Sequence, residues 1–223
     1  MTLTVGLNEG KIEIPFAIQH DLNTFRAWAG DNDLPETARV FYHRGKVWIE
    51  MGKEQLFTHV EVKTEITTVL RTLAKSAKLG RVWGDGVLLT NEEAELSGNP
   101  DMVFLSVATL ASDRVSLTAG ADGGHVEVVG TPDMVLEVVS TSSVTKDGNT
   151  LLEAYFEAGI PEYWVVDARK EALEFTLYKR GAKKYTATKK QGGWLKSVVF
   201  GKSFRLLRET EADGNPTFTL EVK

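Results

Sequence analysis

Two short acidic motifs hold the residues whose types and spacing could do chemistry. Pro100-Asp101 precedes an apolar run, and Glu137 follows Asp133 by four positions. Side chains alternate across a strand, so Asp133 and Glu137 are expected on one face. Glu137 lies among apolar neighbours, where an uncompensated charge is costly. Carboxylate oxygens suit Mg²⁺ or Mn²⁺, and such ions promote phosphodiester hydrolysis.

Each acidic residue also has a structural interpretation. Glu137 could form a salt bridge with a nearby lysine or arginine, although its position favours a metal-binding or catalytic role. Asp133 precedes the strand, and an aspartate at such a place more often caps a turn. A third interpretation takes Asp133 and Glu137 as the acid–base pair of another hydrolase, but no substrate-binding motif supports it.

Three basic or polar features could assist the acidic residues in binding or hydrolysing a phosphodiester. Lys146 lies in the Ser/Thr-rich loop at 140–147 before a predicted helix, where hydroxyls and a lysine would suit a phosphate, although ordinary capping is expected there too. His59 begins a long predicted helix, a place where a lone histidine is more often a surface or capping residue than a ligand. Lysines at 179–184 and 189–190 could contact phosphates or protect a sheet edge, and the latter is slightly favoured.

Composition narrows the function classes. The net charge of −5 counts against a protein held to nucleic acid by long-range attraction alone, but a metal-dependent nuclease can be acidic overall. The absence of cysteine removes disulfides and thiolate chemistry. No P-loop, dinucleotide fingerprint, GxSxG or HExxH motif is present, so no organic cofactor is expected. With no signal peptide or membrane-length apolar run, we expect a cytoplasmic protein without membrane contact.

The elements that must position these residues follow from periodicity and turn signals. Helices are predicted at 20–29, with Asp21 as N-cap, at 58–78, with a Thr58-x-x-Glu61 capping box and Gly80 closing it, and at 147–158. Strands are predicted at 2–16, in a hairpin at 39–51, at 86–90, 101–106, 126–129, 134–139, 163–167 and 173–178, and in a hairpin at 183–207. An acidic loop spans 91–100, and the final dozen residues are either a loose tail or an edge strand. This order predicts an α/β or α+β sheet flanked by helices.

The segment from Thr131 to Asp167 closely resembles the Uma2 family, also called DUF820, within the PD-(D/E)XK superfamily. The resemblance rests on Thr131 to Ser140, on Lys146-Asp147 and Tyr155, and on Ala158 to Asp167. Upstream it extends to Arg44-Gly45-Lys46-Val47, Phe57-Thr58-His59 and Asn99 to Phe104, covering about 38–205 in all. It implies a restriction-endonuclease-like core, a mixed β-sheet flanked by helices, with extra N-terminal and C-terminal strands or hairpins.

The resemblance also implies roles for particular residues. Asp101 matches the PD aspartate and Glu137 the (D/E) acid, both as ligands of Mg²⁺ or Mn²⁺ and both catalytic. The superfamily's lysine would fall at Val139, and the position to which Uma2-like sequences move it is Leu151. Lys146 is the nearest replacement, so we predict it as the catalytic lysine, with Asp133 and His59 as secondary candidates.

The sequence therefore predicts a Mg²⁺-dependent endonuclease that cuts DNA. The alternative is a catalytically silent nuclease-fold module that binds DNA or a protein, which the vacant lysine positions favour. We expect a single domain at 1–223, with a core at 38–205, an N-terminal extension at 1–37 and a C-terminal tail at 208–223. A homodimer is expected by resemblance alone.

Overall fold

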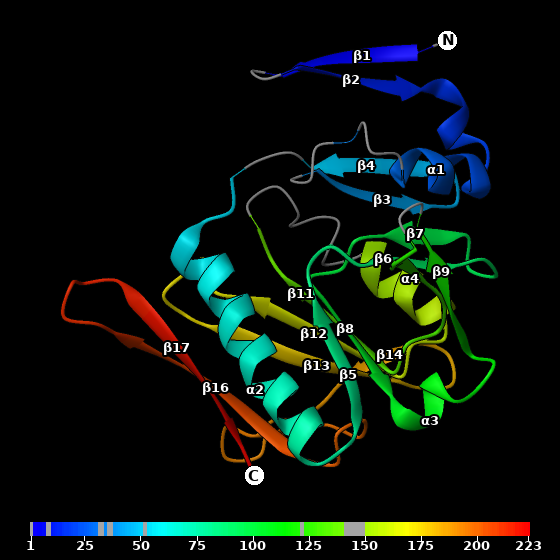
Figure 1. The fold of residues 1–223 in the computed structure, drawn as a ribbon. Coiled ribbons are helices and arrows are strands. Elements are labelled where there is room, and N and C mark those ends of the chain that lie inside the picture. Colours follow the sequence, from blue (N-terminus) through cyan, green and yellow to red (C-terminus); the bar gives the residue numbers. More distant parts are fainter. Residues whose placement is uncertain are drawn as a thin grey trace.

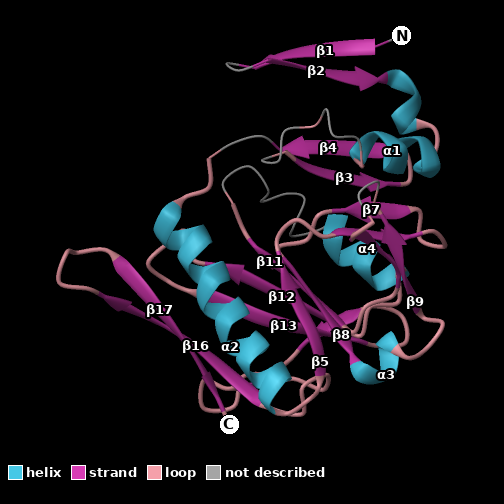
Figure 2. Ribbon diagram, in the orientation of Figure 1, coloured by secondary structure: helices cyan, strands magenta, loops and turns pink. Residues whose placement is uncertain are grey.

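The computed structural model describes residues 2–7, 10–30, 34, 38–50, 53–120, 123–140 and 150–223, with side chains from residue 14 onward in these ranges. Its centre is a six-stranded sheet (Figures 1 and 2). The strand order is β14 (Tyr185–Ala187), β13 (Glu174–Arg180), β12 (Glu162–Asp167), β11 (Met134–Val138), β8 (Met102–Ser106) and β5 (Gly80–Gly84). Only β11 and β12 are parallel within it, so the sheet is mixed.

One face of the central sheet is covered by the long helix α2 (Val62–Ser76) and a C-terminal sheet (Figure 1). That sheet contains β15 (Leu195–Lys196), β16 (Ser203–Thr210) and β17 (Pro216–Val222). Met134, Leu136 and Val138 of β11 pack into this core, as the alternation of the sequence predicts. The final residues, left open as a tail or an edge strand, form β17.

The opposite face carries α4 (Leu151–Glu157), which links the parallel strands β11 and β12. Val135 of β11 packs on this side with Tyr155 of α4 and Tyr163 of β12. Beyond α4 lies a second six-stranded sheet. Its order is β4 (Lys46–Glu50), β3 (Arg39–His43), β7 (Leu96–Gly98), β6 (Leu88–Asn91), β10 (His125–Gly130) and β9 (Val115–Ala119).

Five further elements lie before the second sheet or after β8. The strands β1 (Thr2–Leu7) and β2 (Gly10–Pro15) pair with each other, and the short helix η1 (Phe16–Gln19) leads to α1 (Leu22–Ala29). Asp21 caps α1 as predicted, because its carboxylate accepts a hydrogen bond from the Thr24 amide at 2.6 Å. The helix α3 (Val107–Leu110) follows β8.

Some local predictions were wrong. The predicted capping box at Thr58 does not form, because Gln55 caps a π-helical segment, η2 (Leu56–Glu61), that leads into α2. Gly80 does not close the helix but begins β5, where an added Cβ would lie 2.0 Å from the Leu105 carbonyl oxygen. Lys78 takes the left-handed position after the helix instead.

Other errors concern strands that pair only through distant partners. The predicted acidic loop contains β7, which pairs with β3 and β6, and β5, β9 and α3 had no prediction. The predicted hairpin at 183–207 is not one unit, because β14 pairs with β13 whereas β15 and β16 join β17. The predicted beginning of the helix at 147 lies outside the described residues.

A partly buried ion pair joins α1 to the second sheet and makes stability depend on pH. Arg26 binds both carboxylate oxygens of Glu127, at 2.8 and 2.9 Å. Burial would raise the pKa of Glu127, but hydrogen bonds from Arg26, Thr90 and Thr118 outweigh it and lower the pKa.

We expect Glu127→Gln to lower the free energy of unfolding at pH 7 by about 2 kcal/mol, the usual loss of a hydrogen bond to a charged group. Because the folded pKa is lowered, the stabilisation is present above the ordinary carboxyl pKa of about 4.3 and is lost as pH falls through the folded pKa. Urea unfolding at several pH values should show wild type and variant converging in acid. A constant difference down to about pH 2, well below the carboxyl range, would contradict this.

Candidate active site

The candidate site lies where the first turns of α2 meet the ends of β5 and β8. Asp101 immediately precedes β8 and is 2 % exposed. The antiparallel register pairs Leu136 of β11 with Met102, so the next pair along the strands is Glu137 with Asp101. The β-strands therefore bring the two predicted metal ligands to adjacent positions on neighbouring strands.

Asp101 is held by contacts from several elements. One carboxylate oxygen, Oδ2, accepts a hydrogen bond from the Val138 amide at 2.7 Å and lies 3.8 Å from His59 Nε2. The other, Oδ1, accepts a hydrogen bond from Arg39 and lies 3.6 Å from Lys63 Nζ. Asp101 is thus fixed in orientation and faces both a histidine and two cations.

His59 belongs to this site and is buried, so its interpretation as a surface residue was wrong. Its other ring nitrogen, Nδ1, lies 3.2 Å from Glu54 Oε2. One potential ligand atom from each of Glu54, His59 and Asp101 lies within 4.8 Å of the others. Two carboxylate oxygens and an imidazole form a donor set that suits Mn²⁺, and the carboxylates alone suit Mg²⁺.

Lys63 lies one helical turn after His59, and it is also buried. Its ammonium group donates to Glu54 at 2.9 Å and to Asp85, just after β5, at 2.9 Å. Arg39, at the beginning of β3, bonds to both of these carboxylates as well as to Asp101. Arg39, Glu54, Lys63, Asp85 and Asp101 therefore form one charged network, called the site network below.

The site network shifts the ionisation of two of its members. Burial favours the neutral form of Arg39, but the charge and hydrogen bond of Asp101 together with the charges of Asp85 and Glu54 outweigh burial and raise the pKa above its ordinary value. Burial likewise opposes the ionisation of Glu54, but the hydrogen bond from Lys63 and the charge of Arg39 lower its pKa. Both groups are therefore fully charged at neutral pH.

Glu137 lies on β11 and is 5 % exposed. Its Oε1 accepts a hydrogen bond from the Tyr155 hydroxyl at 2.6 Å. Tyr155 is itself buried on α4 between Phe41 and Tyr163. The tyrosine thus connects the orientation of Glu137 to the packing of α4.

The remaining predicted residues lie elsewhere. Asp133 precedes β11 at the end opposite Glu137, and four residues of strand separate their Cα atoms by about 13 Å. Its carboxylate accepts hydrogen bonds from the Ser106 amide at 2.6 Å and the Thr109 hydroxyl at 2.9 Å, so it supports the N-terminus of α3, whose N-cap is Ser106. Lys146 lies outside the described residues.

The two positions where the resemblance places a lysine are both apolar in the structure. Leu151 is 0 % exposed and packs in the core between α4 and the central sheet. Val139 is buried at the end of β11, with its amide bonded to the Val166 carbonyl at 2.8 Å. In the described part of the chain, the buried lysine nearest Asp101 is Lys63.

Arg39, Glu54, Lys63 and Asp85 were not predicted as site residues. No single motif contains them, since they come from β3, the segment before η2, α2 and the turn after β5. The one available signal was the spacing of His59 and Lys63, which share a helical face with the apolar residues Ile66 and Leu70. A lysine on the apolar stripe of a helix indicates a buried partner.

These features define the class of protein: a mixed sheet flanked by helices, with acidic residues at the ends of adjacent strands, which is the restriction-endonuclease-like fold. A crystal structure described as "a putative nuclease belonging to DUF820" from Anabaena variabilis ATCC 29413 superposes with a TM-score of 0.54 at 18 % sequence identity. The superposition covers 81 % of this chain and 90 % of that one, and it supports the predicted fold.

The chain belongs to the Uma2 family, described as "Putative restriction endonuclease", whose model matches residues 22–222. The family predicted from the motifs is thereby confirmed. No curated protein matches the chain. Among the described residues, no helix is long and apolar enough to cross a membrane.

Proposed function

We propose that this protein is a divalent-cation-dependent endonuclease acting on DNA. The observation that carries the proposal is the convergence of ligand atoms of Glu54, His59 and Asp101 within 4.8 Å, with Asp101 opposite Glu137 where the register of β8 and β11 continues. Membership of the nuclease family and the register of β8 and β11 agree with this assignment. Asp101 and Glu137 would hold Mg²⁺ or Mn²⁺, with Glu54 and His59 as further donors.

A bound cation would supply an activated water and stabilise the charge of the phosphate under attack. The residues of the chain have separate tasks. Tyr155 orients the Glu137 carboxylate, and the Val138 amide orients that of Asp101. Lys63 places its ammonium group 3.6 Å from Asp101 Oδ1, where it can bind a phosphate oxygen, the task that the superfamily assigns to its lysine.

One observation favours the second candidate, a silent nuclease-fold module. Arg39 and Lys63 already compensate the carboxylates of the site network, and the usual lysine positions hold Val139 and Leu151. In that case the buried charges would be structural. The two candidates differ in whether a metal binds and whether DNA is cut.

Plasmid cutting separates them. Wild type is expected to nick supercoiled DNA with Mg²⁺ or Mn²⁺ and not with EDTA. Glu137→Gln keeps the shape of the side chain and can still accept a hydrogen bond from Tyr155. We expect this variant to cut DNA at least about 100-fold more slowly than wild type, a larger loss than is usual when a group that only supports a metal ligand is removed. Glu174→Gln, at an exposed position of β13, is the matched control and should cut normally.

The outcomes separate the candidates. Absence of cutting by wild type with either metal would favour the silent module. Equal cutting by Glu137→Gln and wild type would show that Glu137 is not a catalytic residue, while the proposed endonuclease activity would stand. A homodimer and a cytoplasmic location stay predictions.

A further inference from the structure

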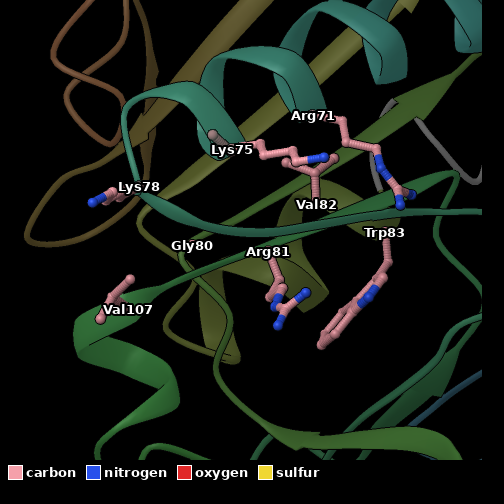
Figure 3. Close-up of a pocket in the computed structure, with 9 residues that line it drawn as sticks. Arg71, Lys75, Lys78, Gly80, Arg81, Val82, Trp83 and Val107 are labelled. Carbon is pink, nitrogen blue, oxygen red and sulfur yellow. The ribbon is translucent and has the colours of Figure 1, made fainter.

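A basic groove runs along the edge of the central sheet, outside the candidate site. It has a volume of about 420 Å³ and lies between α2 and the edge strand β5 (Figure 3). Four cationic residues line it: Arg71, Lys75, Lys78 and Arg81. Among the described residues no carboxylate lines it, although the chain as a whole carries a net charge of −5.

The four cationic side chains are exposed to solvent, so they are available to bind an anionic ligand. Within the part of the chain that the structure describes, none of their side chains has an ion pair with a carboxylate, unlike Lys63 and Arg39 of the site network. In Figure 3, Arg71 and Lys75 extend from α2 toward β5, and Arg81 projects from the strand itself. Charged side chains on an edge strand can prevent pairing with another sheet, and this could explain Arg81. It does not explain the other three cations, because they come from the helix and the residues just after it.

The groove leads to the candidate site. Lys63 and Lys75 are twelve residues apart on α2, a rise of about 18 Å. The strand β5 runs beside the helix and ends next to Asp85, whose amide is bonded to the Asp101 carbonyl at 3.0 Å. Trp83 lines both this groove and a second cavity of about 320 Å³. Asp85 of the site network also lines the second cavity, so Trp83 connects the groove to the site network.

We propose that this groove binds the sugar–phosphate backbone of a nucleic-acid strand and guides it to the site network. The inference rests on the proposed function for its substrate. About 18 Å corresponds to about five nucleotides at 3.4 Å of axial rise per nucleotide, so the strand would meet the four cations before it reaches Asp101. Cations supply affinity for phosphates without reading sequence. A strand with repeated negative charge can contact several of these cations at once, which a single free anion cannot.

The test compares two variants with equal charge. The groove variant carries Arg71→Gln, Lys75→Gln, Lys78→Gln and Arg81→Gln. The hairpin variant carries Lys179→Gln, Lys183→Gln, Lys184→Gln and Lys190→Gln, all at exposed positions in and after the β13–β14 hairpin. Each loses four positive charges, so the formal net charge falls equally from −5. Circular dichroism and thermal unfolding check that both fold.

Binding is measured by fluorescence anisotropy of labelled single-stranded and duplex 20-mers in EDTA, at several salt concentrations, so that no cutting occurs. The groove variant is expected to bind at least about tenfold more weakly, and its salt slope should fall by about 0.7–0.9 for each phosphate that is no longer neutralised. The hairpin variant should behave as wild type. The charge-preserving variant Arg71→Lys/Arg81→Lys should bind within a few-fold of wild type.

Several results would overturn the inference. Equal weakening in both variants would mean that net charge alone controls binding. Unchanged binding by the groove variant would place the DNA elsewhere. Tighter binding of a polyglutamate peptide than of DNA, abolished in the groove variant, would assign the groove to an acidic protein.

The proposed function is judged separately by plasmid cutting. If DNA binding depends on the groove but no metal cuts the plasmid, the proposed endonuclease activity is wrong and the proposed role of the groove stands. If the protein cuts DNA with metal but the groove variant binds DNA as wild type does, only the proposed role of the groove is wrong.

Discussion

Asp101→Asn is expected to abolish calorimetric binding of Mn²⁺ and to slow DNA cutting by at least about 100-fold, because a direct ligand should matter more than the groups that support ligands. The substitution keeps the size of the side chain and an oxygen that can accept from the Val138 amide. It removes the negative charge that faces Arg39 and Lys63. We therefore also expect a loss of about 1–3 kcal/mol in the free energy of unfolding, measured with urea.

Asp133→Asn is the matched control. Asp133 is another buried aspartate, just before β11, but its partners are Ser106, Thr109 and Arg114. We expect it to lower stability by a similar amount and to leave Mn²⁺ binding unchanged. If Asp133→Asn removed cutting while Asp101→Asn did not, the acid–base interpretation of Asp133 and Glu137 would gain support and the metal site would be wrong.

Lys63→Met is expected to slow cutting by about 100-fold, the usual effect of removing one group that stabilises charge in the transition state. Methionine has a similar length and fills the buried space without the charge. Metal binding should be retained or strengthened, since a positive charge 3.6 Å from Asp101 Oδ1 is removed. Reduced cutting with intact Mn²⁺ binding would distinguish Lys63 from a ligand.

Lys146→Ala provides the comparison, because the sequence assigns the catalytic lysine to Lys146. If Lys63 has that role, Lys146→Ala cuts at nearly the rate of wild type. Wild-type cutting by Lys63→Met together with loss of cutting in Lys146→Ala would show that the sequence assignment is right. Single-turnover cutting at saturating protein measures both variants without interference from product release.

Local patterns predicted the central framework well. The alternation at Met134, Leu136 and Val138 predicts a strand with one apolar face, and these residues do pack into one core. The hairpin at Arg44-Gly45 and the helix end at Gly159 depend on glycines with positive φ, which neighbouring residues predict. The local sequence pattern did not predict β5, β7 and β9. The reason is that these strands depend on pairing with distant partners.

The same division holds for the candidate site. Asp101 and Glu137 belong to motifs, and the resemblance names them. Arg39, Glu54, Lys63 and Asp85 belong to none, and among them only Lys63, on the apolar stripe of its helix, carries a local signal of burial. The partners of Lys63 and His59 follow only from the way the first turns of α2 lie against the ends of β5 and β8.

The sequence by itself determined the family and a sheet flanked by helices, because strand alternation, turn glycines and short motifs act over a few residues. The metal-binding roles of Asp101 and Glu137, which the resemblance implies, stay predictions. Tertiary structure alone decided what surrounds Asp101. It placed a histidine, a lysine and an arginine from three elements around one carboxylate, and it buried Leu151 where the family carries its lysine. The physical reason is that buried charges must find partners, and those partners can come from anywhere in the chain that packing brings near.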